Sequence, residues 1–170
     1  MLLELRVENY AVIDNVAAEF GPGLNLLTGE TGAGKSILID ALALLLGEKA
    51  STDVVRHGAD KAVVSAVIEF EGPRIPSILQ EHGIDCDGTE LILRREIGAK
   101  GRVFLNNQPA TVALLKELAP ELASVHAQSE SIVSFDGAAR LELLDAFAGV
   151  DTGETAEAHG KWRGIRERIA

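Results

Sequence analysis

The sequence predicts an α/β fold in which short strands surround one strongly apolar helix, and three observations lead to this prediction. Leu3, Leu5 and Val7 alternate with charged residues, which is typical of a strand with one buried face. The continuously apolar segment 24–28 precedes a glycine-rich turn, and an apolar helical segment follows over 35–46. A chain of 170 residues, 46% hydrophobic and 4% aromatic, is long enough for one domain with an aliphatic core.

The first half of the chain supplies the elements around the apolar helix. A second strand is expected near 16–20, and the turn 21–23 separates it from the third strand. The helix over 35–46 ends before Gly47, a residue type favoured just past a helix C-terminus. Because this helix is apolar nearly all round, with Asp40 the exception, we expect it to be deeply buried.

The second half alternates strands with short helices. Thr111 has a side chain suited to a helix N-cap, and the turn 98–101 separates two strand-like runs that form a hairpin. The elements expected here are strands over 62–71, 90–97, 102–106 and 122–126, and helices over 75–82, 111–118 and 137–147.

The last twenty residues have a different pattern. From Asp151 the chain becomes polar, and apolar residues recur at +4, +3 and +4 spacing, namely Ala158, Trp162, Ile165 and Ile169. This spacing predicts the start of a coiled-coil helix that is cut within its second heptad. We therefore expect one domain over 1–150 and a truncated coiled-coil arm over 151–170.

A phosphate-binding loop lies between the third strand and the apolar helix. The pattern G-x-x-x-x-G-K-[ST] is matched by Gly29, Glu30, Thr31, Gly32, Ala33, Gly34, Lys35 and Ser36. Glycines let the backbone curl so that several N–H groups point at phosphate oxygens, and the following helix adds its positive end. Lys35 reaches the β- and γ-phosphates, and the Ser36 hydroxyl completes the Mg²⁺ shell. The sequence therefore predicts a nucleotide site with Lys35 as a candidate catalytic residue and Ser36 as a metal ligand.

The carboxylate that hydrolysis also needs is not evident. Enzymes with this loop hold Mg²⁺ with an Asp at the end of a neighbouring apolar strand. Leu143-Leu144-Asp145 ends in Asp, but its periodicity is helical, and Glu69 lies in an alternating strand where it faces solvent. The sequence contains no Leu-Ser-Gly-Gly stretch either. The nucleotide site is therefore half present.

Composition and charge argue against several classes of function. The net charge of −10 and the pI of about 4.8 disfavour a broad basic face for nucleic acid. Cys86 is the single cysteine, so no internal disulfide can form, and the four histidines lack metal-ligand spacing. Glu4 and Glu8 lie where a signal peptide would be uncharged, and the longest apolar run, 41–46, is too short to span a bilayer. We expect a cytoplasmic protein with no membrane partner.

Three stretches of the chain resemble the RecN family, bacterial DNA repair ATPases of the SMC-like group with ABC-type heads. They are LRVENYAVIDNVAAEFGPGLNLLTGETGAGKSILIDALALLLGEKAS, GRVFLNNQPATVALLKEL and LASVHAQSESIVSFDGAARLELLDAFAG. The resemblance covers about residues 1–150, whereas the phosphate loop alone indicates only a superfamily. It implies an α/β P-loop NTPase fold, namely the N-terminal lobe of an ABC-type head with a mixed or antiparallel sheet.

The resemblance also implies cofactors, partners and a task. RecN-like proteins place two half-heads at the ends of a long antiparallel coiled coil, and the C-terminal half carries the signature motif, the Mg²⁺-binding Asp and the catalytic Glu. ATP and Mg²⁺ are held between the two heads of a homodimer, so hydrolysis is coupled to dimerisation. The implied task is repair of DNA double-strand breaks by holding or bridging DNA at the nucleoid. This chain alone is then expected to hydrolyse little ATP.

Further site residues follow from the resemblance. Gln128 aligns with the family's Q-loop glutamine, which contacts Mg²⁺ and the attacking water, so it is the second candidate catalytic residue. The family's Gly-Gln-His is replaced by Ala127-Gln128-Ser129, which puts any role of the family's histidines in doubt. Arg56 falls where related heads carry an arginine that approaches nucleotide or DNA, with a surface arginine as the alternative. Arg6 and Asn9 are candidates for framing the adenine.

Other interpretations stay open at this point. Arg94, Arg95, Lys100 and Arg102 form a local basic strip, which we expect to keep a sheet edge solvated, with DNA contact as the alternative. A complete small P-loop kinase fits the chain length, although its only possible lid, 94–102, resembles a hairpin. A non-hydrolysing, nucleotide-gated interaction module is the third possibility.

Overall fold

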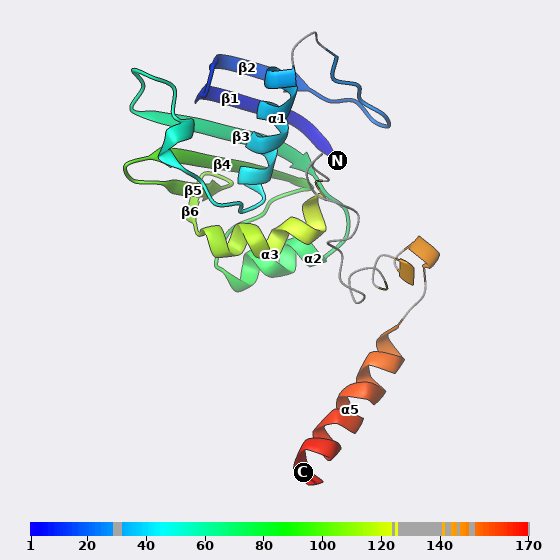
Figure 1. Ribbon diagram of the computed structural model, residues 1–170. Helices are drawn as coiled ribbons and strands as arrows, with labels where there is room; N and C mark the ends of the chain where they lie inside the picture. Colours follow the sequence, from blue (N-terminus) through cyan, green and yellow to red (C-terminus); the bar gives the residue numbers. More distant parts are fainter. Residues whose placement is uncertain are drawn as a thin grey trace. The chain divides into compact units, whose positions relative to one another are not determined.

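A computed structural model of the chain describes residues 1–28, 32–123 and 125, the positions 141, 144–145 and 147–149, and residues 152–169 (Figure 1). The side chains at 33, 167 and 169 lie outside this description. The chain divides into two compact units, Met1–Val125 and His126–Ala170, and each is described by itself. The expected domain division at residue 150 stays a prediction.

The first unit is built on a six-stranded sheet. Its strands are β1 (Leu2–Tyr10), β2 (Ile13–Glu19), β3 (Lys61–Glu69), β4 (Glu90–Gly98), β5 (Arg102–Leu105) and β6 (Gln108–Ala110). They lie in the order β2-β1-β3-β4-β5-β6, and each neighbouring pair is antiparallel. The expected strands over 62–71, 90–97 and 102–106 are confirmed, with ends shifted by at most two residues.

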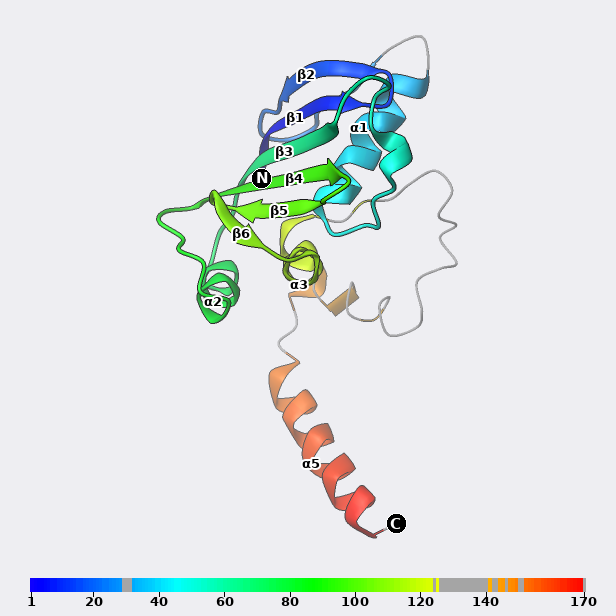
Figure 2. The ribbon, with the colours of Figure 1, turned by 90° about the vertical axis from the view of Figure 1, so that its left-hand side faces the viewer.

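The helices of this unit are α1 (Gly32–Leu45), α2 (Arg74–Glu81) and α3 (Val112–Leu122), with a 3₁₀ turn, η1 (Thr52–Val54), after α1. Helix α1 packs on β1, β3 and β4, and α2 packs against α3, whereas none of the described helices of this unit covers the other face of the sheet, the open face (Figure 2). The aliphatic core between helices and sheet includes Leu5, Val7, Ala41, Leu44, Leu45, Val64, Ala66, Ile68, Leu91, Leu93, Leu105, Leu114, Leu115 and Leu118. An aliphatic core is therefore confirmed, and it lies on the helix side of the sheet, whereas the buried Val63 faces the other side.

Helix α1 ends as its sequence predicts. Gly47 has a φ of +95°, and its N–H donates to the Leu44 carbonyl while the Glu48 N–H donates to the Ala43 carbonyl. These two bonds form a Schellman cap, which requires a residue in the left-handed region after the last turn. The expectation of deep burial all round is wrong, because only one face of α1 meets the sheet: Ile39 is 40% exposed.

The β5–β6 hairpin and α3 follow from local signals. Asn106 and Asn107 both have positive φ, as a two-residue hairpin turn requires, and they place β6 beside β5 where no strand was expected. The Thr111 side chain accepts a bond of 3.2 Å from the Leu114 N–H, so the predicted N-cap is confirmed. Helix α3 continues through Leu122, so the strand expected to begin there is wrong at its first residue.

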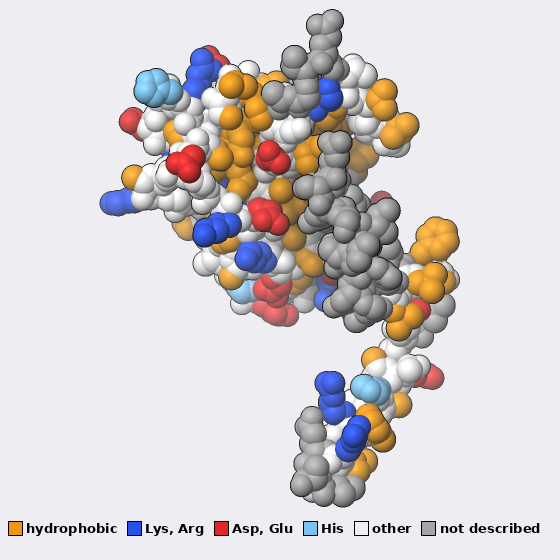
Figure 3. All heavy atoms as spheres, in the orientation of Figure 1, with side chains coloured by type: hydrophobic (Ala, Val, Ile, Leu, Met, Phe, Trp, Pro, Cys, Tyr) orange, Lys and Arg blue, Asp and Glu red, His pale blue; other side chains and the backbone are white. Residues whose placement is uncertain are grey.

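The segment 24–28 is not a strand, contrary to expectation. Leu24, Leu26 and Leu27 are 91%, 76% and 42% exposed, and hydrophobic side chains gather at the surface of this segment (Figure 3). A strand needs a neighbour to accept its backbone bonds, and no strand of the described sheet lies beside it. The apolar run predicted a buried strand, but the described chain supplies nothing to pair with it.

The second unit contains α5 (Gly153–Ile169), the helix predicted from residue 151 onward. Its polar surface carries an i,i+4 ion pair, with the Lys161 Nζ atom 2.6 Å from the Glu157 carboxylate. Trp162 and Ile165, two of the expected seam residues, are half exposed. The helix expected over 137–147 falls mostly outside the described residues.

Candidate nucleotide site

The phosphate loop leads directly into α1. Residues 29–31, the side chain of Ala33, and Gln128 lie outside the described residues. Gly34, Lys35 and Ser36 belong to the beginning of α1, whose first turn contains no acidic residue. The first N–H groups of a helix have no partner within it, and they carry its positive end. The start of α1 can therefore bind an anion, and the nearby Lys35 adds a full positive charge.

The described part of the loop leaves room for a ligand. An added Cβ at Gly34 would meet nothing within 4 Å, and Ser36 is exposed. Among the described residues, no group of three or more His, Cys, Asp or Glu side chains is placed to hold a metal ion. The exposed Ser36 hydroxyl is an oxygen of the type that a hard cation such as Mg²⁺ prefers, and Mg²⁺ usually keeps waters and phosphates as its other ligands.

Two of the other predicted site residues, Asn9 and Arg56, are brought together by the fold. The Arg56 N–H donates to the Asn9 carbonyl at 2.9 Å, and Tyr10 forms an isolated antiparallel bridge with Val55. Asn9 has a φ of +52°, so the chain turns sharply at the end of β1. The Arg56 guanidinium lies 3.5 Å from the exposed Asp14 carboxylate. The segment after η1 therefore pairs with the end of β1, and this pairing places Arg56 beside Asn9.

Arg6 lies apart from these residues and from α1. Its Nε atom donates to the Glu4 carboxylate at 2.5 Å, on the open face of the sheet. This bond and the charge of the partner lower the pKa of Glu4 and raise the pKa of Arg6. Because α1 packs on the opposite face, the sheet separates the Arg6 side chain from the phosphate loop helix. The adenine role of Arg6 stays a prediction, and that of Asn9 likewise.

The predicted basic strip is divided by the pleat of β4. The register pairs Arg94 with Ser65 on the open face and Arg95 with Val64 on the helix face. Arg94, Lys61 and Arg102 gather around Glu96 on the open face, whereas Arg95 is 6% exposed. Strand β4 lies between β3 and β5, so the expected role of the strip at a sheet edge is wrong.

The sequence prediction placed Arg95 in a solvated strip and missed its buried contact. Its Nη1 atom donates to the carbonyl oxygens of Leu44 at 2.5 Å and Glu48 at 2.6 Å, both at the C-terminal end of α1. A signal was available: Leu91, Leu93 and Ile97 alternate through β4, and Arg95 occupies the same series. An arginine in a core-facing series indicates a buried polar contact, not a surface charge.

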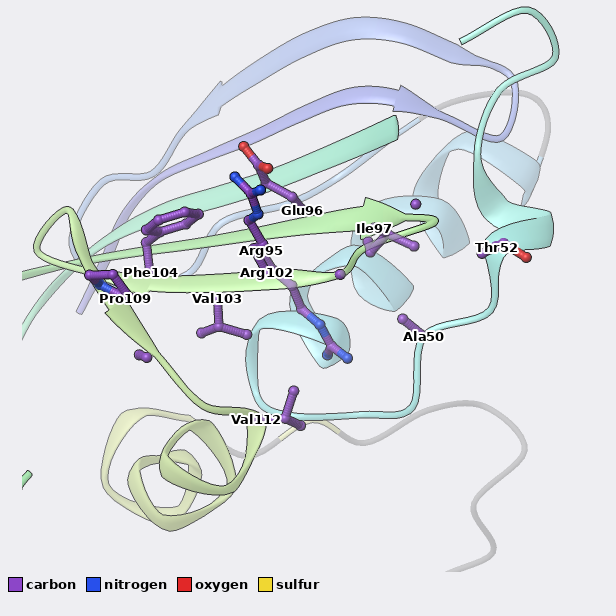
Figure 4. A pocket seen from close by; sticks show the side chains of 13 residues that line it. Ala50, Thr52, Arg95, Glu96, Ile97, Arg102, Val103, Phe104, Pro109 and Val112 are labelled. Carbon is purple, nitrogen blue, oxygen red and sulfur yellow. The ribbon is translucent and has the colours of Figure 1, made fainter. Parts of the chain in front are cut away.

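A pocket of about 730 Å³ lies near this second end of α1, between the segment after the helix and the ends of β4, β5 and β6 (Figure 4). Its lining residues are Ala50, Thr52, Arg95, Glu96, Ile97, Gly98, Gly101, Arg102, Val103, Phe104, Pro109, Ala110 and Val112. None of these residues belongs to the phosphate loop. The pocket and the phosphate site therefore lie at opposite ends of one helix.

Two further observations concern the cysteine and the helices. Burial raises the pKa of the Cys86 thiol above its ordinary value, which makes a reactive thiolate less available. Among the residues that the structure describes, no helix combines the length and apolar character needed to cross a bilayer.

The comparison with protein families matches residues 4–142 to the AAA domain. The DNA repair protein RecN of Bacillus subtilis is 38% identical over 154 residues, which are 89% of this chain and 27% of that protein. RecN of Vibrio cholerae is 38% identical over 167 residues, or 96% of this chain and 30% of that protein. The chain thus spans about 30% of the length of the curated relatives it matches.

Solved structures show the same fold. A chain from a study of ATP-driven dimerisation and DNA-stimulated activation of SMC ATPases aligns with a TM-score of 0.62 at 20% identity, over 85% of this chain and 97% of that chain. The SMC head domain of Thermotoga maritima aligns with a TM-score of 0.53 at 22% identity, over 68% of this chain and 41% of that one. The predicted P-loop fold of an SMC-like ATPase head is therefore confirmed.

Proposed function

Because this chain belongs to the AAA domain family and is related over nearly its whole length to RecN proteins, we propose that it is the ATP-binding lobe of an SMC-like ATPase head that acts in repair of DNA double-strand breaks. The observation that carries this proposal is the complete phosphate-loop sequence leading into α1 on a fold shared with SMC heads. In this proposal the backbone of residues 29–36 and the start of α1 bind the phosphates.

The proposed roles of individual residues follow from their chemistry. Lys35 contacts the β- and γ-phosphates and stabilises the charge that develops during transfer. Ser36 contributes a hydroxyl to Mg²⁺, which when bound neutralises phosphate charge. Gln128 orients the attacking water and contacts the metal, and Arg56 approaches the nucleotide or DNA beside Asn9. These assignments come from the motif and from the resemblance to RecN-like heads.

The rest of the site is proposed to come from the C-terminal half of the same head and from a second head. The exposed side chains of Leu24, Leu26 and Leu27 support this proposal. An apolar segment with strand-like sequence is stabilised when another segment pairs with its backbone and covers its side chains. We propose that ATP is held between two such heads, so that dimerisation and hydrolysis are coupled. DNA is the proposed partner of the whole protein.

The structure does not support the kinase alternative, because the segment proposed as its lid is part of the sheet. Residues 94–102 form the end of β4 and the turn into β5, and Arg95 within them is buried against α1. A lid has to open and close over its substrates, so its arginines have to reach the nucleotide. The nucleotide-gated module remains compatible with the proposal, since this lobe can bind ATP without completing hydrolysis by itself.

Nucleotide binding by the chain is tested with a substitution in the loop. Lys35→Ala is expected to weaken the affinity for MgATP roughly tenfold or more, since a contact to a charged group contributes about 1.5–3 kcal/mol. Isothermal titration calorimetry measures the affinity, and Lys49→Ala is the control because Lys49 is an exposed lysine just past the other end of α1. Equal affinities of the wild type and Lys35→Ala would contradict the proposed site.

A further inference from the structure

Arg95 joins β4 to the C-terminal end of the phosphate-loop helix. The side chain is 6% exposed, and its Nη1 atom donates to the carbonyl oxygens of Leu44 and Glu48. The Leu44 carbonyl also accepts from the Gly47 N–H, so Arg95 joins the Schellman cap that ends α1. The helix terminus is thus held by a side chain from the middle of the sheet.

The charge of Arg95 is compensated by the helix and not by a carboxylate. Among the described residues, none of the ion pairs includes Arg95, and the neighbouring Glu96 pairs with Lys61 and Arg94 on the other face. The carbonyls at a helix C-terminus carry its negative end, which favours a cation there. Burial lowers the pKa of the Arg95 guanidinium, yet an arginine stays protonated in proteins. Removing this cation would leave buried carbonyls with fewer partners.

We propose that Arg95 is a positioning residue for nucleotide binding, which fixes the axial position of α1 and thereby places Lys35 and Ser36. Helix α1 has 14 residues, or about 20 Å at 1.5 Å per residue, and a helix this short moves as a rigid rod. A shift at its C-terminal end therefore moves its N-terminal end as well. This inference rests on the proposed phosphate site, although Arg95 itself does not touch it.

A second contact restricts the same helix end. An added Cβ at Gly47 would lie 2.5 Å from Cγ and 3.1 Å from the backbone nitrogen of Lys116 in α3. Gly47 therefore allows α1 and α3 to pack closely, and Arg95 ties the same turn to β4. Sheet and helix layer together hold this end of α1, and a rigid helix transmits that restraint to its phosphate-loop end.

The direct test compares two neighbouring arginines on opposite faces of β4. Arg95→Met removes the two bonds to α1 and keeps the apolar stem, and we expect about a fivefold or greater loss of MgATP affinity. Arg94→Met is the matched control, because Arg94 is exposed and contacts Glu96 and Phe104 on the open face. Its affinity is expected to stay within about twofold of the wild type. Titrations are run well below each melting temperature, so that the folded fraction is the same.

Chemical rescue separates positioning from a loss of stability. Arg95 lines the open pocket, so a small guanidine can enter the space that Arg95→Ala creates (Figure 4). Methylguanidine at millimolar concentration is expected to restore much of the MgATP affinity, whereas methylammonium restores less because it lacks the planar fork. Arg95→Lys is expected to lie between the wild type and Arg95→Met.

Each outcome decides one question. Wild-type affinity in Arg95→Met, or a loss of affinity that only follows the loss of folded protein and that no guanidine restores, would overturn the positioning role. If Arg95→Met does not fold, Arg95→Lys decides, and wild-type affinity in that variant would count against the two-bond contact. A wild-type chain that binds no MgATP would instead refute the proposed function, because every variant would then be compared with no binding.

Discussion

Three consecutive residues of β4 have different surroundings because their side chains point to alternate faces of the sheet. Arg94 lies on the open face, Arg95 is buried against α1, and Glu96 lies on the open face between Lys61 and Arg94. Charge counting along the sequence groups the arginines together, whereas the two-residue period of a strand separates them. The alternation was visible in the sequence, but which face the helices cover was not.

Glu96 makes the pH dependence of stability testable. Its carboxylate accepts from Lys61 at 2.9 Å and from Arg94 at 2.7 Å, and the hydrogen bond from Lys61 is the main cause that lowers its pKa. A lowered pKa in the folded state means that the stabilisation is complete above the unfolded value, about 4.3, and is lost as the pH falls below it.

The Glu96→Gln variant should therefore lose part of this dependence. Urea unfolding between pH 3 and pH 7 is expected to show a smaller fall in the free energy of unfolding at acid pH than in the wild type. Glu90→Gln, an exposed glutamate on the same strand, serves as the control. If the free energy of unfolding of Glu96→Gln falls with decreasing pH as steeply as that of the wild type, the ionised Glu96 does not contribute to the pH dependence of stability.

At the scale of elements, α1 illustrates which features local sequence determines. Its end at Gly47 was predicted, because a cap depends on residues close in the chain, whereas the helix begins at Gly32, three residues before the predicted start. The extent of its burial was not predicted correctly, because that depends on which other elements pack around it. The same limit explains segment 24–28, whose apolar run predicted a strand although no described strand pairs with it.

Gly47→Ala tests the end of α1. The residue has a φ of +95°, and an alanine Cβ would lie 2.5 Å from Cγ and 3.1 Å from the backbone nitrogen of Lys116. We expect a loss of more than about 1 kcal/mol in the free energy of unfolding, measured by urea denaturation. Gly164→Ala in α5 is the contrasting case, since an added Cβ there meets nothing within 4 Å and alanine favours helix. Equal effects of the two changes would contradict the role given to the cap.

At the scale of the whole molecule, the fold class and the phosphate-loop motif were accessible from sequence. The phosphate loop is a contiguous motif, so its eight residues could be named without a structure. Contacts between distant elements, such as Arg95 with the end of α1, and the association of Asn9 with Arg56 could not, because they depend on tertiary pairing. We propose that the remaining part of the site comes from other chain segments, and that one of them pairs at the exposed leucines of 24–28.

We propose that this chain supplies one side of an ATP site whose other side comes from the C-terminal half of the head. The most direct test of this proposal is steady-state phosphate release from MgATP by this chain alone and together with the C-terminal half of the head to which it is proposed to belong. We predict very slow release by the chain alone, turnover when the two are combined, and loss of that turnover with Lys35→Ala. Rapid, Lys35-dependent turnover by the chain alone would contradict the account.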